Sequence, residues 1–400
     1  MLLFLGSGIS VPSGLPGIVD LTRAVLGAHS STVASGGSLQ ADNELHPPAS
    51  NHNSAASHAL LKLLFDLDAE SRASIACYPS GKGFKYSGAI YRKQTTYEDL
   101  FYLCEQIRWS GEALVDDVPI ALLVDEVEKR AGGILPAASR EARLFALYRL
   151  AKEASKLIER TIESSLLCFE PIGLDAISQL ATEESLDIVT LNHDTLVEQA
   201  LWSAGIIFYD GFGPTDGDVR WSHSKFTSPP STRVRIVKPH GSIDWKRFLV
   251  SGSAKVGKVA PGMKSGWRDS SMNEIPLYSS APSFLTGNNK IASYNSGIYA
   301  EMMHAFHQAL RDNDTMVMSG YGWGDLGINL RIETWLDQST ERRLILLHEK
   351  PSELIDRSLQ IDQSHRYWIE SGKLIMIEKW LCNVSPEELL KAINSTSTKE

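Results

Sequence analysis

The sequence predicts an α/β fold in which a parallel sheet of about six strands carries helices on both faces, together with a mostly helical inserted module. Six short runs of β-branched and aliphatic residues are typical of strands, and several lack polar alternation, as expected for strands covered on both faces. Amphipathic segments of helical period separate most of these runs. The runs are Leu2–Leu5, Asp187–Leu191, Val234–Lys238, Thr315–Ser319, Leu344–His348 and Leu374–Glu378.

Helices are predicted between the strands because apolar residues recur there with a period near 3.6. Strands that alternate with helices in this way form a parallel sheet. Near the end of the sequence, Ser385, Pro386 and Glu388 suit the N-cap, the first and the third position of a short closing helix. The segments between the strands include Thr195–Leu201, Ile298–Leu310 and Gly327–Leu336.

The inserted module follows the first strand and its helix, Leu15–Leu26. It begins with Gly27–Ser57, whose Ser, Gly, Asn and Pro content is typical of a flexible surface loop. We therefore assign residues 1–30 and 180–400 to the sheet domain and residues 31–179 to the loop and helical insertion. Helices of the insertion are predicted at Thr96–Trp109, Ile120–Arg130 and Ser139–Glu163, and further long loops at Gly213–Thr232 and Ser251–Asn273.

The composition argues against several classes of protein. A net charge of −9 without a run of lysine or arginine argues against direct binding to nucleic acid or to an anionic membrane. The apolar run Met1–Leu5 is too short for a signal peptide, and no apolar stretch approaches the roughly 20 residues of a membrane span. These features favour a cytoplasmic location. Four scattered cysteines predict neither a zinc site nor a disulfide framework: Cys77, Cys104, Cys168 and Cys382.

A glycine-rich turn, Gly6–Pro16, comes directly after the first strand. Exposed N–H groups and a helix N-terminus in such a turn favour the charge of a pyrophosphate, and glycines let the backbone approach it. The ordinary dinucleotide fingerprint has a third glycine where Val11 stands, so a standard nicotinamide dehydrogenase is disfavoured. A purely structural role for the glycines is the alternative.

Polar residues also follow the second and third strands. Asn192 and Asp194 come after the second strand, and His240 comes after the third. Ligands of open parallel sheets collect beyond the carboxyl ends of the strands, and an imidazole accepts protons near neutral pH. The alternatives are that Asn192 ends its strand, that Asp194 caps the next helix, and that His240 is a hydrogen-bonded bystander.

Four segments together resemble the sirtuin family. Gly6–Ser10 with Gly14-Leu15-Pro16 is similar to its Gly-Ala-Gly-Ile-Ser and Gly-Ile-Pro opening, and Thr190–Asp194 to its Thr-Gln-Asn-Ile-Asp motif. Lys238–Trp245 is similar to the Lys-x-His-Gly-Ser-Ile/Leu-x-Trp stretch of related NAD-hydrolysing domains. Ser319–Asn329 resembles the Gly-Tyr-Ser-Phe-Gly-Asp-x-x-Ile-Asn signature of stand-alone bacterial domains, with glycine at position 322 in place of the serine. The family order is kept, which implies a Rossmann-like NAD-binding domain.

The resemblance also implies roles for particular residues. His240 would activate a ribose hydroxyl or a water, Asn192 would contact the nicotinamide ribose or position the water, and Asp194 would hold the nicotinamide carboxamide. The other residues implied to bind NAD are Gly6, Ser7, Gly8, Ser10 and Pro16 of the glycine-rich turn, Thr190, Gly241, Ser319, Gly320 and Tyr321 at other strand ends, and His348 near the adenine ribose.

Two departures from the family pattern favour NAD hydrolysis over protein deacylation. Gly17-Ile18-Val19 replaces the Asp-Phe-Arg of deacylases, and the four-cysteine zinc module is missing. The chain thus resembles the bacterial antiphage branch, whose members deplete cellular NAD, often as homo-oligomers and under a partner such as a HerA-type ATPase or an Argonaute-like protein. NAD would be the substrate, and no zinc is expected. The alternatives are an NAD-dependent protein deacylase or ADP-ribosyltransferase, and a non-catalytic NAD or nucleotide sensor.

Overall fold

The computed structural model divides the chain into two compact units. Unit 1 comprises Met1–Leu15, Leu166–Leu285 and Asn289–Glu400, and unit 2 comprises Pro16–Ser165 and Thr286–Asn288. The residues that the structure describes are 1–27, 51–76, 94–111, 118–167, 169–212, 220–227, 234–250, 252–259, 267–268, 274–287 and 290–394.

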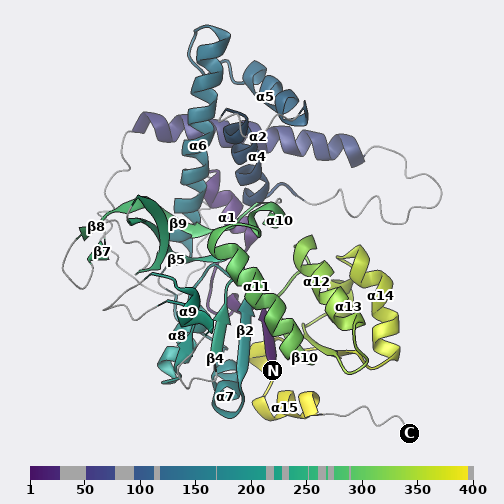
Figure 1. Ribbon diagram of the computed structural model, residues 1–400. Helices are drawn as coiled ribbons and strands as arrows, with labels where there is room; N and C mark the ends of the chain where they lie inside the picture. The colour runs from purple at the N-terminus through teal and green to yellow at the C-terminus, as the bar shows by residue number, and fades with distance from the viewer. Residues whose placement is uncertain are drawn as a thin grey trace, which may run out of the picture. The chain divides into compact units, whose positions relative to one another are not determined.

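Unit 1 is built on a seven-stranded sheet whose strands all run parallel (Figure 1). The strand order is β12-β11-β10-β1-β2-β4-β3, so β1 lies between β2 and β10. This topology confirms the predicted α/β class, and the six predicted strands are all present. The sequence did not predict β3, because a strand of two residues shows no period. The strands are β1 (Leu2–Leu5), β2 (Leu186–Thr190), β3 (Phe208–Tyr209), β4 (Val234–Val237), β10 (Thr315–Ser319), β11 (Arg343–Leu347) and β12 (Leu374–Ile377).

Helices cover both faces of this sheet, as predicted. Side chains of β1 alternate between the two faces. Leu3 and Leu5 pack in the core between the sheet and helices α7, α8 and α15, whereas Leu2 and Phe4 pack in the core between the sheet and helices α11, α12 and α14. Both faces are therefore apolar, which explains why the strand sequences lack polar alternation. The helices of unit 1 are α7 (Asp175–Glu183), α8 (Leu196–Ser203), α9 (His223–Thr227), α10 (Lys290–Ser293), α11 (Gly297–Asp312), α12 (Leu326–Asp337), α13 (Pro351–Ile355), α14 (Leu359–Glu370) and α15 (Pro386–Asn394).

A smaller antiparallel sheet follows β4, and the sequence did not predict it. Its order is β6-β5-β9, and β5 begins at Gly241, directly after the turn that ends β4. The loop predicted over Ser251–Asn273 is therefore wrong for β6 and for the two-residue β7, whereas residues 251, 260–266 and 269–273 lie outside the described residues. The sequence of β6 has one large apolar residue and so shows no strand period. In Gly213–Thr232, residues 223–227 form α9, and 213–219 and 228–232 lie outside the described residues. The strands of this sheet are β5 (Gly241–Val250), β6 (Ser253–Lys258) and β9 (Leu277–Phe284). The strands β7 (Trp267–Arg268) and β8 (Glu274–Ile275) pair with each other in a separate two-stranded sheet.

Unit 2 is helical, in agreement with the inserted module. Helix α1 (Ile18–Val25), the first helix of this unit, packs on α4 and α6. The N–H of Tyr97, the first residue of α4, donates to Oγ1 of Thr22 in α1 (3.0 Å). For this reason α1 lies in unit 2, whereas the predicted boundary at residue 30 puts it in the sheet domain. Residues 51–57 of the predicted loop are helical, and residues 28–50 lie outside the described residues. The helices are α1 (Ile18–Val25), α2 (Asn51–Ala76), α4 (Tyr97–Gly111), α5 (Val118–Arg130) and α6 (Arg140–Ser165).

Within the described part of the chain, no helix has both the length and the apolar character needed to cross a bilayer. The same residues contain no group of three or more His, Cys, Asp or Glu side chains arranged to hold a metal ion. Cys104 and Cys382 are free thiols. The other two cysteines, Cys77 and Cys168, lie outside the described residues.

Glycines allow the turns after β1 and β10 to approach closely. The N–H groups of Gly6 and Gly8 donate to the carbonyl oxygens of Ser319 (3.0 Å) and Gly320 (2.9 Å). Gly320 has φ +71°, and a Cβ there would lie 2.5 Å from the Ile9 nitrogen and 2.6 Å from the Gly6 oxygen. No side chain fits between these two backbones, so the glycines have a structural role whether or not they also meet a ligand.

Substitution of Gly320 by alanine is expected to destabilise unit 1. The new Cβ would clash with rigid backbone, and the left-handed conformation adds strain, for a combined cost of about 2 kcal/mol or more. A loss of that size lowers the midpoint of thermal unfolding by about 4–8 °C in a unit of this length. Gly324→Ala is the matched control, because a Cβ at Gly324 meets no atom within 4 Å. Equal midpoints for the two variants would contradict the close-contact explanation.

Candidate active site

The four sequence segments that carry polar residues reach one edge of the parallel sheet. They follow β1, β2, β4 and β10, which lie side by side in the order β10-β1-β2-β4. The chain first builds the sheet from β1 toward β4 and β3, and then returns to the other side of β1 at β10. The order therefore reverses between β1 and β10, and ligands of open α/β sheets bind in the crevice at such a switch point.

Ser10 links the glycine-rich turn to the segment after β2. Its hydroxyl donates to Asp194 Oδ2 (2.8 Å) and accepts from Asn192 Nδ2 (3.0 Å). The Asn192 backbone N–H donates to Thr190 Oγ1 (3.2 Å), and all four residues are buried. Asn192 Oδ1 has no hydrogen-bond partner among the described residues. Since an unpaired buried carbonyl costs free energy, this oxygen is a natural acceptor for a ligand hydroxyl or a water.

The Asp194 carboxylate has a local role and a role in the site. Its Oδ1 accepts the N–H of Leu196 (3.1 Å), the first residue of α8, although the N-cap position of that helix is Thr195 rather than Asp194. Its Oδ2 remains available to Ser10. Burial raises the pKa of Asp194, and the nearby Lys238 ammonium and the Ser10 hydrogen bond oppose that rise. The protein, rather than bulk water, therefore sets the charge of this group.

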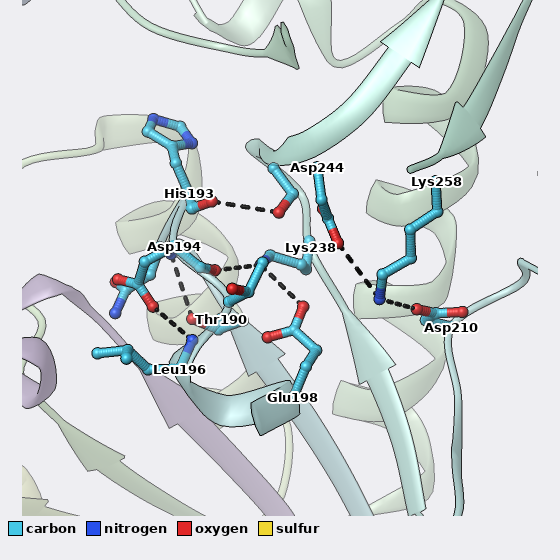
Figure 2. Close-up of polar contacts among 12 residues, drawn as sticks. Thr190, His193, Asp194, Leu196, Glu198, Asp210, Lys238, Asp244 and Lys258 are labelled. Carbon is cyan, nitrogen blue, oxygen red and sulfur yellow. Dashed lines mark hydrogen bonds and ion pairs between the residues drawn. The ribbon is translucent and has the colours of Figure 1, made fainter. Parts of the chain in front are cut away.

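Lys238 supports the segment that carries Asp194 (Figure 2). Its Nζ donates to the Asp194 backbone oxygen (2.5 Å) and to Glu198 Oε1 (2.9 Å). The side chains of Lys238 and Glu198 are only 2% and 8% exposed. Burial raises the pKa of Glu198, but the positive charges of Lys238 and Lys258 lower it by more, so the net shift is downward. This buried ion pair ties β4 to α8 and thereby holds the loop between β2 and α8.

His240 contacts side chains from two other segments. Its Nε2 lies 2.6 Å from the Tyr294 hydroxyl and 3.1 Å from Asp325 Oδ2, and the Tyr294 hydroxyl donates to the same oxygen (2.6 Å). Tyr294 follows α10, and Asp325 lies in the segment after β10. Burial raises the pKa of Asp325, but the hydrogen bonds and charge of His240 and the Tyr294 hydroxyl lower it well below its usual range. Asp325 is therefore an ionised carboxylate at neutral pH.

His193 places a second imidazole beside His240. The His193 ring stacks on Phe284, with centroids 4.5 Å apart, and lies 6.3 Å from the His240 ring. Burial lowers the pKa of His193 well below its usual value, and the positive charges of His240, Lys290 and Lys238 act in the same direction. His193 is therefore neutral at physiological pH, although the sequence analysis did not select it.

The remaining predicted residues of the crevice differ in their surroundings. Ser7 is exposed and begins the short 3-10 helix Ser7–Ser10. Gly241 has φ +74°, and a Cβ there would lie 2.4 Å from the Ser283 carbonyl oxygen, so glycine is required for packing. Ser319 Oγ is buried and has no partner among the described residues. It is thus a second unpaired polar atom at the switch point.

Three predicted binding residues are less directly connected to these groups. The Tyr321 hydroxyl donates to Asn329 Oδ1 (2.7 Å) and so lies within the turn after β10 rather than toward Asn192. His348 Nδ1 accepts the Lys350 N–H (2.9 Å), and no hydrogen bond among the described residues joins His348 to the other predicted residues. Pro16 is the first residue of unit 2. Their roles in binding remain predictions.

Residues 187–370 match the family described as the SIR2-like domain. This match begins in β2, ends in α14 and includes the second, third and fourth segments. It supports the sirtuin-like resemblance for this part of the chain. A search of curated proteins found no match.

The chain is also similar to solved structures of low sequence identity. A mutant Sir2 homologue in complex with ADP ribose is 10% identical with a TM-score of 0.40, and the alignment covers 100% of this chain and 94% of that chain. A Sir2 homolog–NAD complex is 10% identical with a TM-score of 0.35, and the alignment covers 61% of this chain and 75% of that chain. The sheet topology, rather than these similarities, establishes the fold.

Removal of the Lys238 ammonium is expected to destabilise the protein strongly. In Lys238→Met, the Glu198 carboxylate stays buried without its main partner, at a cost of roughly 3–5 kcal/mol. The double variant Lys238→Met/Glu198→Leu is expected to recover much of this loss, because it leaves no unpaired charge. Thermal unfolding of both variants and the wild type measures the effect. A single variant as stable as the wild type would show that the ion pair does not hold this loop.

Proposed function

We propose that the chain is an NAD glycohydrolase that cleaves the bond between nicotinamide and ribose to give nicotinamide and ADP-ribose. A SIR2-like domain points to NAD binding or NAD processing. The observation that carries the proposal is that buried Asn192, Asp194 and His240 follow the adjacent strands β2 and β4 at the carboxyl edge of the sheet. The unpaired Asn192 Oδ1 supports it, because a structural asparagine has no need of an unsatisfied oxygen at this position.

The reaction requires little covalent chemistry from the protein. The glycosidic C–N bond breaks, its electron pair passes to the pyridinium nitrogen, and neutral nicotinamide leaves. The ribose carbon develops oxocarbenium character and accepts the oxygen of a water, while one proton is released. The protein must therefore hold the dinucleotide, place the water, and accept a proton.

The buried groups suit these tasks. Asn192 Oδ1 accepts a hydrogen bond from the water or from a ribose hydroxyl, and His240 receives the proton as general base. Asp194 accepts a hydrogen bond from the nicotinamide carboxamide. Ser319, with its unpaired hydroxyl, and the neighbouring backbone at Gly320 lie beside the glycine-rich turn, where we place the adenosine side of NAD.

His240→Ala and Asn192→Ala are each expected to lower NAD cleavage about 100- to 10,000-fold, which is the usual effect of losing a positioned base. Nicotinamide release from purified protein measures the rate, and circular dichroism checks that each variant is folded. His304→Ala is the matched control, because His304 is an exposed histidine on α11. A folded His240→Ala variant that releases nicotinamide at the wild-type rate would remove His240 from the mechanism.

The products distinguish this activity from its alternatives. Protein deacylation would yield acylated ADP-ribose from an acyl-peptide, and ADP-ribosyl transfer would yield a modified acceptor. A sensor would bind NAD without turnover in every assembly state. ADP-ribose and nicotinamide in equal amounts, with water as the acceptor, are the expected result.

We further propose a cytoplasmic role in bacterial antiphage defence, in which a homo-oligomer depletes NAD under the control of a partner such as a HerA-type ATPase or an Argonaute-like protein. The support is the resemblance of the four segments, together with a helical insertion in a chain whose sequence lacks the four-cysteine zinc module of deacylases. Phage infection of bacteria that express the chain and its genomic neighbours is expected to lower cellular NAD. Unchanged NAD in infected cells, or equal loss with His240→Ala, would contradict this role.

A further inference from the structure

We propose that Asp325 and Tyr294 are positioning residues that keep a proton on Nε2 of His240, so that Nδ1 is the nitrogen that accepts the proton in NAD hydrolysis. The assignment of the protonated nitrogen stands on the geometry alone, whereas its catalytic consequence rests on the proposed function. The three groups form a triangle: Nε2 to the Tyr294 oxygen 2.6 Å, Nε2 to Asp325 Oδ2 3.1 Å, and the Tyr294 oxygen to Asp325 Oδ2 2.6 Å.

A count of protons decides the tautomer. The Tyr294 hydroxyl has one proton, and it donates that proton to the ionised Asp325 carboxylate. If Nε2 carried a lone pair, it would face the lone pairs of the tyrosine oxygen and of the carboxylate at hydrogen-bond distance. A proton on Nε2 instead satisfies both contacts, because it is shared between the two oxygens. Nε2 is therefore a donor, and in the neutral imidazole the basic atom is Nδ1.

The surrounding structure holds the carboxylate in place. Asp325 Oδ1 accepts the Ile328 N–H (3.1 Å) and caps α12, and the Asp325 backbone N–H donates to the Tyr321 hydroxyl (3.1 Å). The Tyr294 ring is nearly parallel to the His240 ring, at 14°, with centroids 5.9 Å apart. The carboxylate and the phenol are thus fixed before a substrate arrives, as an efficient positioning pair requires.

The other titratable groups near His240 do not replace Asp325. His193, which follows β2, is neutral because burial and nearby positive charges lower its pKa. Lys290 of α10 and Lys238 after β4 are cations whose charges lower the pKa of His193, and Lys290 also lowers that of Asp325. Tyr321, whose hydroxyl accepts the Asp325 backbone N–H, has a pKa raised well above its usual value, chiefly by burial, and is therefore neutral. Among the described residues whose contacts are given, Asp325 is the carboxylate that hydrogen-bonds to the His240 imidazole.

The proton path follows from this arrangement. When the water oxygen bonds to the ribose carbon, the water proton passes to His240 Nδ1, and the C–N electron pair leaves with nicotinamide. The imidazolium that forms carries protons on both nitrogens, and its charge lies beside the Asp325 carboxylate. The proton then returns to solvent from Nδ1. A carboxylate in this position orients the imidazole and stabilises its charged form, as in hydrolases that pair histidine with aspartate.

Nitrogen NMR of ¹⁵N-histidine-labelled full-length protein tests the tautomer without any substrate. We expect Nε2 of His240 to show the signature of a protonated nitrogen and Nδ1 that of an unprotonated one at a pH where the ring is neutral, with the resonance identified by its loss in His240→Gln. Tyr294→Phe is expected to keep this tautomer, because Asp325 still accepts from Nε2. A proton on Nδ1 in the wild type would overturn the proposal.

Asp325→Asn tests the catalytic consequence. Asparagine caps a helix as well as aspartate does, so α12 is expected to stay intact, but the amide lacks the charge and can donate to Nε2. We expect kcat to fall roughly 100- to 10,000-fold with little change in KM. The pH at which activity reaches half its plateau is expected to move lower, because a neutral neighbour disfavours the protonated ring.

The possible results separate the two proposals. Wild-type kcat and an unshifted pH profile in folded Asp325→Asn would overturn the positioning role, since a helix cap alone predicts that outcome. Absence of NAD hydrolysis by the wild type would instead contradict the proposed function and leave the NMR result to decide the tautomer.

Discussion

The close backbone contact between the turns after β1 and β10 is the constraint on which the candidate site depends. Gly6 and Gly8 donate to carbonyl oxygens of the β10 turn, and a Cβ at Gly320 would overlap this backbone. The contact fixes both turns as they leave the sheet. Ser10, four residues after Gly6, then reaches the segment after β2, and Asp325, five residues after Gly320, reaches His240. The close packing of these glycines therefore fixes the positions of Ser10 and Asp325.

The site consists of two hydrogen-bonded groups that different strands contribute. Ser10, Asn192 and Asp194 join the ends of β1 and β2, which are neighbours. His240 and Asp325 come from the ends of β4 and β10, which are separated by β1 and β2 and therefore by about 14 Å at the usual strand spacing. The second group must bridge the width that β1 and β2 occupy. The second group therefore requires the strand order β10-β1-β2-β4, whereas the first group requires only that β1 and β2 be neighbours.

The sequence predicted the sheet well because its signals are local. A strand buried on both faces is a continuous apolar run, and all six such runs are strands in the structure. The second sheet left no such signal: Ser253–Lys258 is a strand because it pairs with β5, and its own residues are mostly polar or small. The boundary of the insertion is hard to predict for a related reason, since periodicity shows that a helix such as α1 has an apolar face but does not show what covers it.

The candidate site was only partly predictable for the same physical reason. Asn192, Asp194 and His240 could be selected because they directly follow strands whose ends must meet. Lys238 and Asp325 lie inside the segments that resemble the sirtuin family, but the sequence does not show their partners. The fold places Lys238 beside Glu198 and Asp325 beside His240. Tyr294 follows a short helix outside any recognisable motif, and no pattern in the sequence relates it to His240. Long-range pairs of this kind require the fold to be known.

The charges at the switch point suit a ligand with opposite charges at its two ends. The chain has a net charge of −9, yet the pyrophosphate of NAD is an anion and its nicotinamide ring is a cation. The Asp194 carboxylate and Asn192 both hydrogen-bond to Ser10, and the Asp325 carboxylate contacts His240. The proposed reaction places the nicotinamide ribose beside these groups. Bond cleavage moves positive charge from the pyridinium to the ribose, and carboxylates fixed nearby favour that charge in either location. In the proposed binding mode, the pyrophosphate therefore lies away from these carboxylates, toward the glycine-rich turn. The N–H groups of Gly6 and Gly8 already donate to the β10 turn, so in the proposed binding mode we expect other donors of the glycine-rich turn to bind the phosphates.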